Sequence, residues 1–367
     1  MKVYYLFAPV EPDCVGPTSG IEKKVKSQVE SLCSESAGKF STCTLVTLPV
    51  VEHKGNALEK IVRRLPRTAG WRKWSYKGEF HDADALYIRK VNEDASFIKY
   101  LKAVKHDNPD IQIIYEIPTY PEKTGNANFA NLNFILKERH AKKQLHKYID
   151  RIVTFYGQNA IYNIPCIQLK NGYDFSKVDL PTREKTDSVK LLSVALNMNW
   201  HGYDRLIKGI KKYYADGGTE KIIYHVVGPI LNEYGERNDH IILHGPLHGE
   251  ELNALYKECL VGIDILGGHR KDYPVSSTLK SREYAAYGLP MVTSSPIDYM
   301  PEGYLYQHLV PYDDSPIDIK ALLKWYHSVY DGRDCNIIAK EIRDYAFDRC
   351  DMRATMKPVL DYLNHEQ

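Results

Sequence analysis

Short apolar runs alternate with stretches of helical periodicity along the whole chain. Runs of four to eight apolar, often β-branched residues predict buried strands of a parallel sheet. In the first half we expect strands at Lys2–Ala8, Cys43–Val50, Ala85–Lys90, Ile111–Ile117, Arg151–Tyr156 and Cys166–Lys170. Helices fit between them, one beginning near Gly20 and others at Glu93–His106 and Ala130–Ile149.

The same alternation starts again after a polar stretch at Asp174–Ser188. The expected strands are Val189–Leu196, Lys221–Gly228, Ile241–Gly245, Val261–Gly268 and Met291–Thr293. The expected helices are Tyr203–Tyr214, Glu250–Cys259, Pro316–Tyr330, Cys335–Phe347 and Ala354–Asn364. This order predicts two doubly wound α/β domains with parallel sheets facing a cleft. We place the domains at 1–173 and 189–346, a linker at 174–188, and a helix packing back on the first domain at 347–367.

The candidate chemistry lies where the strand Val261–Gly268 leads into the next helix. Ser277 is the predicted N-cap of that helix, but Lys280 stands where a capping box would place Glu or Gln. Three more cations lie nearby, namely Arg270, Lys271 and Arg282. Because free amides and the helix dipole already make this terminus positive, the pattern predicts a bound phosphate or diphosphate.

Glu283 lies one turn after Lys280 and can accept hydrogen bonds from a sugar or ribose hydroxyl beyond the phosphates. The alternative is that Lys280 and Glu283 pair with each other on a solvated surface. The cations around them favour the ligand.

Composition limits the classes of protein. The chain has 367 residues, 43% of them hydrophobic, and a formal net charge of +2, so electrostatic arguments must be local. Seven scattered cysteines without a CxxC motif indicate reduced thiols rather than a disulfide framework or a zinc site. No apolar run approaches the ~18 residues of a membrane span, and no cleavable signal precedes the first strand. We expect a cytoplasmic protein.

One charge anomaly stands in the first half. Between Lys60 and Lys77 there are seven cations and no acid, with aromatic residues interleaved. The residues of interest are Arg63, Arg64, Trp71, Arg72, Lys73 and Trp74. This composition favours docking on an anionic membrane surface or a phosphorylated acceptor. Nucleic acid is the rival partner, which we do not expect, and a solvated loop with packed tryptophans is the third interpretation.

The segment SREYAAYGLPMVTS resembles the Glu-x-x-Ala-x-Gly-x-Pro-Val signature of GT-B glycosyltransferases. It is most similar to the retaining family 4 enzymes of bacterial polysaccharide synthesis, with Glu283 at the second signature glutamate. SVALNMNWHGYDRLIKGI is similar to the first strand and helix of their donor domain. The order of elements extends the resemblance to essentially the whole chain and implies a GT-B fold.

The resemblance implies roles for individual residues. Glu283 would hold the ribose, and Gly20 would lie under the phosphates or the transferred sugar. The amides around Ser276, Ser277 and Thr278 would hold the diphosphate.

The chain also departs from the family pattern. Val275 replaces the first signature glutamate, leaving Asp272 as a stand-in. Leu196 and His201 stand near the places where the family tends to carry Arg and Lys. We infer that these roles have passed to Arg270, Lys271 and Lys280, assisted by His201 or Arg205. The alternative for Trp200-His201-Gly202 is a plain helix entry.

The expected reaction is sugar transfer from a nucleotide sugar, a UDP-sugar rather than a GDP-sugar, to a glycan or polyprenyl-linked acceptor. Lys280 and Arg270 would stabilise the leaving phosphate. We expect no cofactor or metal, because no DxD-type acidic cluster follows a strand. Glu116, Thr119 and Tyr120 are the candidates for sugar or acceptor contacts, although Glu116 could equally be a structural acid.

The resembled enzymes suggest retention, a role in surface polysaccharide or capsule synthesis, and peripheral attachment to the inner face of the cell membrane. Two alternatives remain open. One is a GT-B-like subunit that binds nucleotide or glycan without catalysis, and the other is a sugar-nucleotide epimerase.

Overall fold

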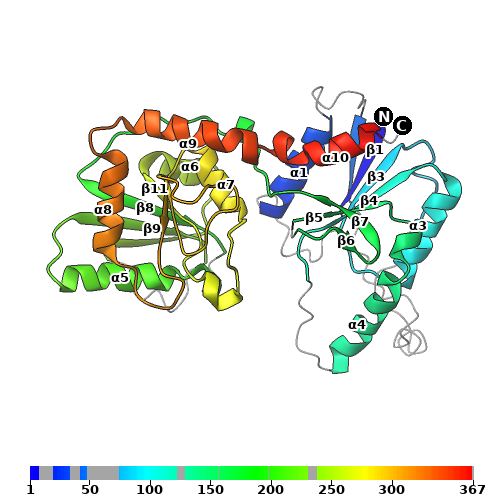
Figure 1. Ribbon diagram of the computed structural model, residues 1–367, viewed down its shortest axis with the longest axis horizontal. Helices are drawn as coiled ribbons and strands as arrows, with labels where there is room; N and C mark the ends of the chain where they lie inside the picture. The colour runs from blue at the N-terminus through cyan, green and yellow to red at the C-terminus, as the bar shows by residue number, and fades with distance from the viewer. Residues whose placement is uncertain are drawn as a thin grey trace. The chain divides into compact units, whose positions relative to one another are not determined.

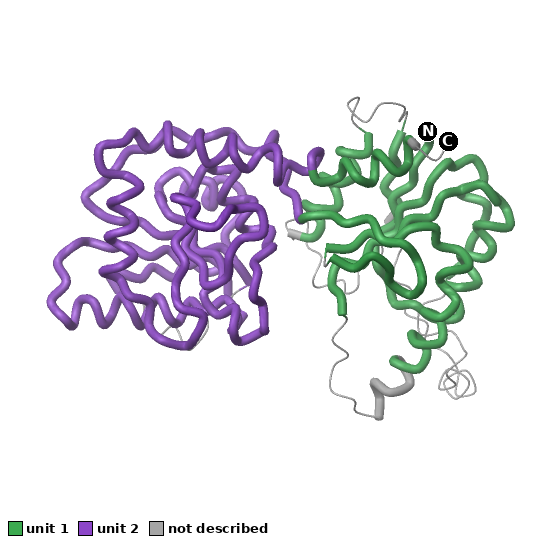
Figure 2. Tube along the Cα trace, in the orientation of Figure 1, with its two compact units in different colours: residues 1–170, 355–367 green, residues 171–354 purple. Residues whose placement is uncertain are grey.

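The chain forms two compact units in a computed structural model (Figure 2). Unit 1 comprises Met1–Lys170 and Thr355–Gln367, and unit 2 comprises Asn171–Ala354. The structure describes residues 1–7, 20–33, 42–47, 74–121, 129–155, 157–196, 198–229 and 238–365.

Unit 1 is built on a seven-stranded sheet with the strand order β2-β1-β3-β4-β5-β7-β6 (Figure 1). Its strands are β1 (Lys2–Phe7), β2 (Thr42–Thr47), β3 (Ala85–Arg89), β4 (Gln112–Ile117), β5 (Arg151–Thr154), β6 (Ala160–Ile161) and β7 (Ile164–Gln168). All neighbours are parallel except β6 and β7. The central strands β3 and β4 are almost entirely buried, as their apolar sequences predict.

Four helices connect strands of unit 1, namely α1 (Gly20–Cys33), α3 (Ala95–Asp107), α4 (Phe129–Lys142) and η3 (Leu145–Lys147). The greater part of α10 (Met352–His365), the last helix in the described ranges, also belongs to this unit. Asp94 caps α3 by accepting hydrogen bonds from the amides of Ser96 and Phe97. Strand order reverses between β1 and β3, so the carboxyl ends of these strands form a topological switch point.

Unit 2 contains a six-stranded parallel sheet with the order β10-β9-β8-β11-β12-β13. The strands are β8 (Ser188–Val194), β9 (Lys221–Val227), β10 (Ile241–Gly245), β11 (Val261–Ile263), β12 (Met291–Thr293) and β13 (Gln307–Leu309). Its helices are η4 (Phe175–Lys177), η5 (Asn199–His201), α5 (Tyr203–Ala215), α6 (Gly249–Glu258), η7 (Gly268–Lys271), α7 (Leu279–Ala286), α8 (Ile319–Tyr330) and α9 (Cys335–Cys350). The switch point of this sheet lies between β8 and β11.

Both expected sheets are present, with local differences. The segment 174–188 is packed into unit 2 instead of forming a free linker, because Phe175 is fully buried and Arg183 donates to the carbonyl of Tyr256 at 2.7 Å. Helix α8 begins at Ile319 with Asp318 as its cap, three residues after the predicted start at Pro316. The short strands β6 and β13 were not predicted, since two or three residues carry no periodicity.

Candidate functional site

Two loops meet at the switch point of unit 2. One follows β8 and leads through η5 to Gly202, and the other follows β11 and leads through η7. Gly202 has φ +69, and a Cβ on it would lie 2.4 Å from the backbone nitrogen of Gly267. Only glycine permits this approach of the two loops. Ligands of doubly wound sheets bind at this position.

Asp264 is the centre of the second loop. It follows β11 directly, and its side chain is fully buried. It accepts hydrogen bonds from Ser276 Oγ at 2.5 Å and from Thr278 Oγ1 at 2.6 Å. One buried carboxylate therefore fixes both ends of the segment that leads into α7. Asp264 was not among the residues predicted from the sequence, although an acid directly after a buried strand was a usable signal.

The segment 276–279 presents backbone amides at the start of α7. The cap is Thr278, not Ser277, because Thr278 Oγ1 accepts a hydrogen bond from the amide of Ser281 at 3.2 Å. The amide of Ser276 already donates to the carbonyl of Pro296 at 2.8 Å, so it is not available to a ligand. The amides of Ser277, Thr278 and Leu279 make no hydrogen bond to any described residue. These three N–H groups can donate hydrogen bonds to a bound anion.

Lys280 lies immediately beside them and is 9% exposed. Its Nζ donates to the Asp264 carbonyl at 2.5 Å and to Tyr203 Oη at 2.8 Å, and it lies 3.7 Å from Asp264 Oδ1. Burial lowers the pKa of Lys280 from 10.5 to about 8, although Asp264 opposes that change. Asp264 thus offsets only part of the cost of burying the charge on Lys280, and a bound anion would further stabilise the charged form.

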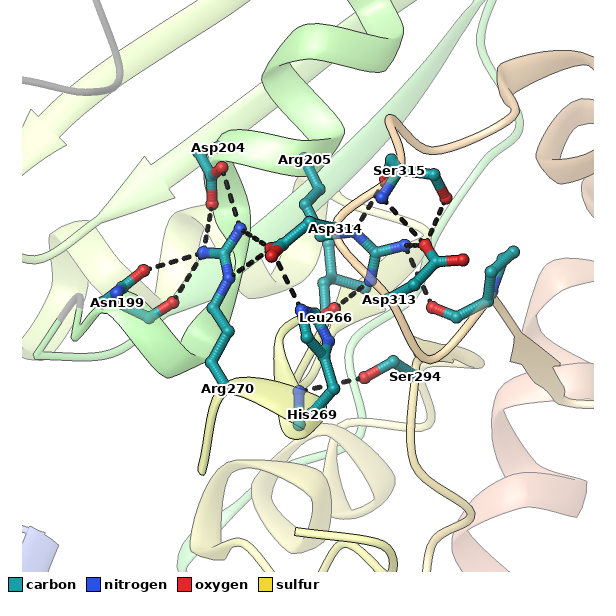
Figure 3. Close-up of polar contacts among 12 residues, drawn as sticks. Asn199, Asp204, Arg205, Leu266, His269, Arg270, Ser294, Asp313, Asp314 and Ser315 are labelled. Carbon is teal, nitrogen blue, oxygen red and sulfur yellow. Dashed lines mark hydrogen bonds and ion pairs between the residues drawn. The ribbon is translucent and has the colours of Figure 1, made fainter. Parts of the chain in front are cut away.

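Arg270 is not free to bind a ligand. It forms hydrogen bonds to both oxygens of Asp204, at 2.7 and 3.1 Å, and to Asp314 and Asn199 (Figure 3). Its hydrogen bonds to Asp204 raise the pKa of Arg270. The cations at this helix terminus therefore already have acidic partners, which the local sequence pattern does not reveal. The acids come from elsewhere in the chain, in the pairs Arg270–Asp204, Arg282–Asp298 and Lys280–Asp264.

Arg205 serves the structure of the loops. It is fully buried and donates to the carbonyls of Leu266, Pro311 and Ser315 (Figure 3). These carbonyls belong to two segments of unit 2, the loop after β11 and the connection between β13 and α8, which Arg205 holds together. A guanidinium without exposed surface cannot contact a nucleotide, so the structure does not support its predicted binding role.

His201 and Lys271 lie close to Lys280. His201 Nδ1 accepts a hydrogen bond from the amide of Met198 at 3.0 Å, which places the imidazole proton on Nε2. Burial, together with Lys280 and Lys271, lowers the pKa of His201 to about 2, so the ring is a neutral donor. Lys271 is exposed, and its Nζ lies 4.4 Å from the centre of the Trp200 ring.

Glu283 lies one turn further along α7 and is half-buried. Its Oε1 accepts a hydrogen bond from Tyr173 Oη at 3.2 Å. The nearby Arg282 is fully buried and bonded to Asp298 and to the carbonyl of Asn171. Val275 is 49% exposed, and Asp272 is exposed in a left-handed conformation with φ 51.

Glu116 lies at the carboxyl end of β4 in unit 1 and is fully buried. One oxygen accepts from Arg89, and the other accepts from Tyr87 Oη at 2.6 Å and Gln28 Nε2 at 2.7 Å. Burial opposes ionisation of Glu116, but Arg89 and Lys24 outweigh it and lower its pKa. This is the geometry of a structural acid that fastens α1 to the sheet, and it leaves no exposed oxygen for a substrate.

The other predicted residues of unit 1 are only partly described. Thr119 is exposed after β4, and the ring of Tyr120 packs edge-on against Tyr162 at 6.4 Å. Gly20 is the first residue of α1. Trp74 is partly buried and packs against Phe97 and Tyr100 of the core. The other residues of interest in the basic stretch lie outside the described residues, namely Arg63, Arg64, Trp71, Arg72 and Lys73.

In the ranges that the structure describes, no three His, Cys, Asp or Glu side chains group closely enough to hold a metal ion. None of the helices within those ranges has the length and apolar character needed to cross a membrane.

Comparison with known proteins shows the fold. No family model and no curated protein sequence matches the chain. An alpha-glucosyltransferase solved with UDP and a 13-mer DNA is 12% identical, with 99% of both chains covered and a TM-score of 0.61. Anabaena Alr3699/HepE, solved with UDP, is also 12% identical, with 99% of this chain and 100% of that chain covered and a TM-score of 0.58. The trehalose-6-phosphate synthase OtsA is 10% identical, with 100% and 99% covered and a TM-score of 0.58. The chain has the fold of the GT-B glycosyltransferases.

Proposed function

We propose that the protein is a glycosyltransferase that uses a nucleoside diphosphate sugar. The observation that carries the proposal is the group of amides at Ser277, Thr278 and Leu279, which bond to none of the described residues, beside the buried Lys280. An anion at this point gains hydrogen bonds from the amides and the helix dipole, and it restores full charge to Lys280. The two neighbours solved with UDP support a uridine nucleotide as donor.

In the proposed reaction, the acceptor hydroxyl oxygen bonds to the anomeric carbon of the donor sugar. The bond from that carbon to the outer phosphate oxygen breaks, and a donor phosphate oxygen takes the acceptor proton. Negative charge grows on the outer phosphate, where the amides and Lys280 stabilise it more strongly than in the ground state. We propose that no metal takes part and that the anomeric configuration is retained, as the resemblance to family 4 implies.

The neighbouring side chains receive roles in the same proposal. Glu283 binds the ribose hydroxyls, and His201 supplies a neutral Nε2–H donor to the diphosphate or sugar. Lys271 is the exposed cation that meets the incoming nucleotide. Arg270 and Arg205 hold the two loops in register and do not touch the donor.

The acceptor is proposed to be a glycan or polyprenyl-linked sugar in surface polysaccharide synthesis, with the protein at the membrane surface. The test is nucleotide release from a panel of UDP- and GDP-sugars, with and without lipid-linked acceptors. Acceptor-dependent UDP release supports the proposal. Tight UDP binding without turnover would indicate a binding subunit, and donor conversion without acceptor would indicate an epimerase.

Variants locate the site. Lys280→Met should lower UDP affinity, and Lys211→Met, which removes an exposed lysine of α5, is the matched control. Equal UDP affinity in both variants would contradict the assignment of the site.

A further inference from the structure

The two units have net formal charges of opposite sign. Unit 1 contains 27 Lys and Arg against 20 Asp and Glu, whereas unit 2 contains 22 against 27. Unit 2 is nevertheless the unit with the proposed donor site. The excess of positive charge on unit 1 therefore favours an anionic partner other than the donor.

A cavity of about 420 Å³ in unit 1 gathers part of this charge. One wall is formed by α4 and the residues that follow it, and the other by Tyr162 and Asn163 between β6 and β7. The basic residues that line it are Arg139, Lys142, Lys143 and His146. The volume is that of a small-molecule site.

The charge of the cavity is poorly neutralised. Glu138 is the acid among the lining residues, and it already pairs with Lys142 at 3.2 Å. Arg139, Lys143 and His146 are exposed and form no ion pair with any residue in the described ranges. The cavity can thus accept one or two phosphate groups by charge-assisted hydrogen bonds.

The opposite wall adds an aromatic ring. Tyr162 and Asn163 both have left-handed backbone angles, φ 52 and 63, in the tight turn between β6 and β7. The Tyr162 ring lies 5.7 Å from Lys142 Nζ and 6.4 Å from the ring of Tyr120. Tyr120 was selected from the sequence as an acceptor contact. An aromatic face beside cations fits a sugar ring that carries phosphate.

We propose that this cavity binds the phosphate-bearing end of the acceptor, a sugar linked to one or two phosphates. The proposal rests on the proposed function and names the class of its acceptor. Arg139 and Lys143 hold the phosphates, and Tyr162 stacks on the sugar. A nucleic acid would need phosphate contacts along an extended surface, which a cavity of this size does not offer.

The experiment is calorimetric titration of the full chain with inorganic pyrophosphate while UDP is kept saturating, so that the donor site is filled. We expect one remaining pyrophosphate site. Arg139→Gln combined with Lys143→Gln should weaken pyrophosphate affinity at this site at least tenfold. The charge-matched control is Lys99→Gln combined with Lys102→Gln, which replaces two exposed lysines of α3 and should change pyrophosphate affinity less than twofold.

Each outcome decides the proposal. The proposal is overturned if no pyrophosphate site remains, or if the Arg139→Gln/Lys143→Gln variant binds pyrophosphate as the parent does. Equal losses of affinity in this variant and in the control also contradict it, because they indicate diffuse electrostatics. Flotation with phosphatidylglycerol vesicles is the parallel measurement. If the Arg139→Gln/Lys143→Gln variant loses vesicle binding while pyrophosphate never binds, the surface is a membrane contact. UDP affinity is measured separately, so failure of the donor site is distinguished from failure of this one.

Discussion

Replacing Lys280 by methionine should make the protein more stable and a worse binder of UDP. Methionine keeps the length of the side chain and removes a charge that the fold tolerates poorly. A pKa lowered from 10.5 to about 8 corresponds to roughly 3 kcal/mol, at about 1.4 kcal/mol per pH unit. The lost hydrogen bonds to Tyr203 and to the Asp264 carbonyl offset about half of this. We expect the free energy of unfolding to rise by about 1–2 kcal/mol at pH 7.

The pH dependence gives a second readout. Between pH 8 and 10.5 the unfolded chain holds the Lys280 proton and the folded protein does not, so the stability of the parent rises with pH. The variant lacks this rise. UDP affinity of the parent should fall as the pH passes 8, because Lys280 loses the charge that pairs with the diphosphate.

The assays are urea denaturation followed by circular dichroism, and UDP titration calorimetry, each at pH 7 and 9.5. At pH 7 the variant should bind UDP about 10- to 100-fold more weakly, which is the change in affinity expected from the loss of one charge-assisted hydrogen bond. A variant that is less stable than the parent and binds UDP equally well would refute the reasoning. It would show that Lys280 is an ordinary structural lysine.

Three further substitutions test the framework of the site. Asp264→Asn should weaken UDP binding at least tenfold while the chain still folds, because the asparagine side chain no longer accepts from both the Ser276 and Thr278 hydroxyls, which position the backbone amides of the segment 276–279. Unchanged UDP affinity by calorimetry would contradict this. Glu116→Gln should lower the free energy of unfolding by about 3–5 kcal/mol, since Arg89 loses its buried partner, and exposed Glu30→Gln is the control in the same denaturation assay. Gly202→Ala should lower the melting temperature and UDP affinity together, because its Cβ would meet Gly267; a protein as stable as the parent would show that the loops can separate.

The fold was largely predictable from the sequence because each layer has its own pattern. Buried strands such as Ile111–Ile117 are mostly apolar, and the alternation of strands with helices determines the parallel sheets. The linker was misjudged because DFSKVDLPTREKTDS has few apolar residues, whereas Phe175, Val178 and Arg183 are buried and anchor it in unit 2.

The site was harder to predict because its electrostatics depend on contacts between distant residues. The sequence shows Arg270 among cations, but its partner Asp204 stands 66 residues earlier. Thr278 takes the cap instead of Ser277 because its hydroxyl is held by Asp264, which lies 14 residues earlier at the start of the same loop. Sequence patterns locate the helix end and Lys280, while only the folded chain shows which cations already have partners.

The most direct test of the central claim is a crystal structure of the protein with UDP. We predict diphosphate oxygens within hydrogen-bond distance of the amides of Ser277, Thr278 and Leu279, with Lys280 Nζ turned toward them. UDP bound elsewhere, for example in the cavity of about 670 Å³ beside Tyr214 and His240, with these amides still unbonded, would contradict the account.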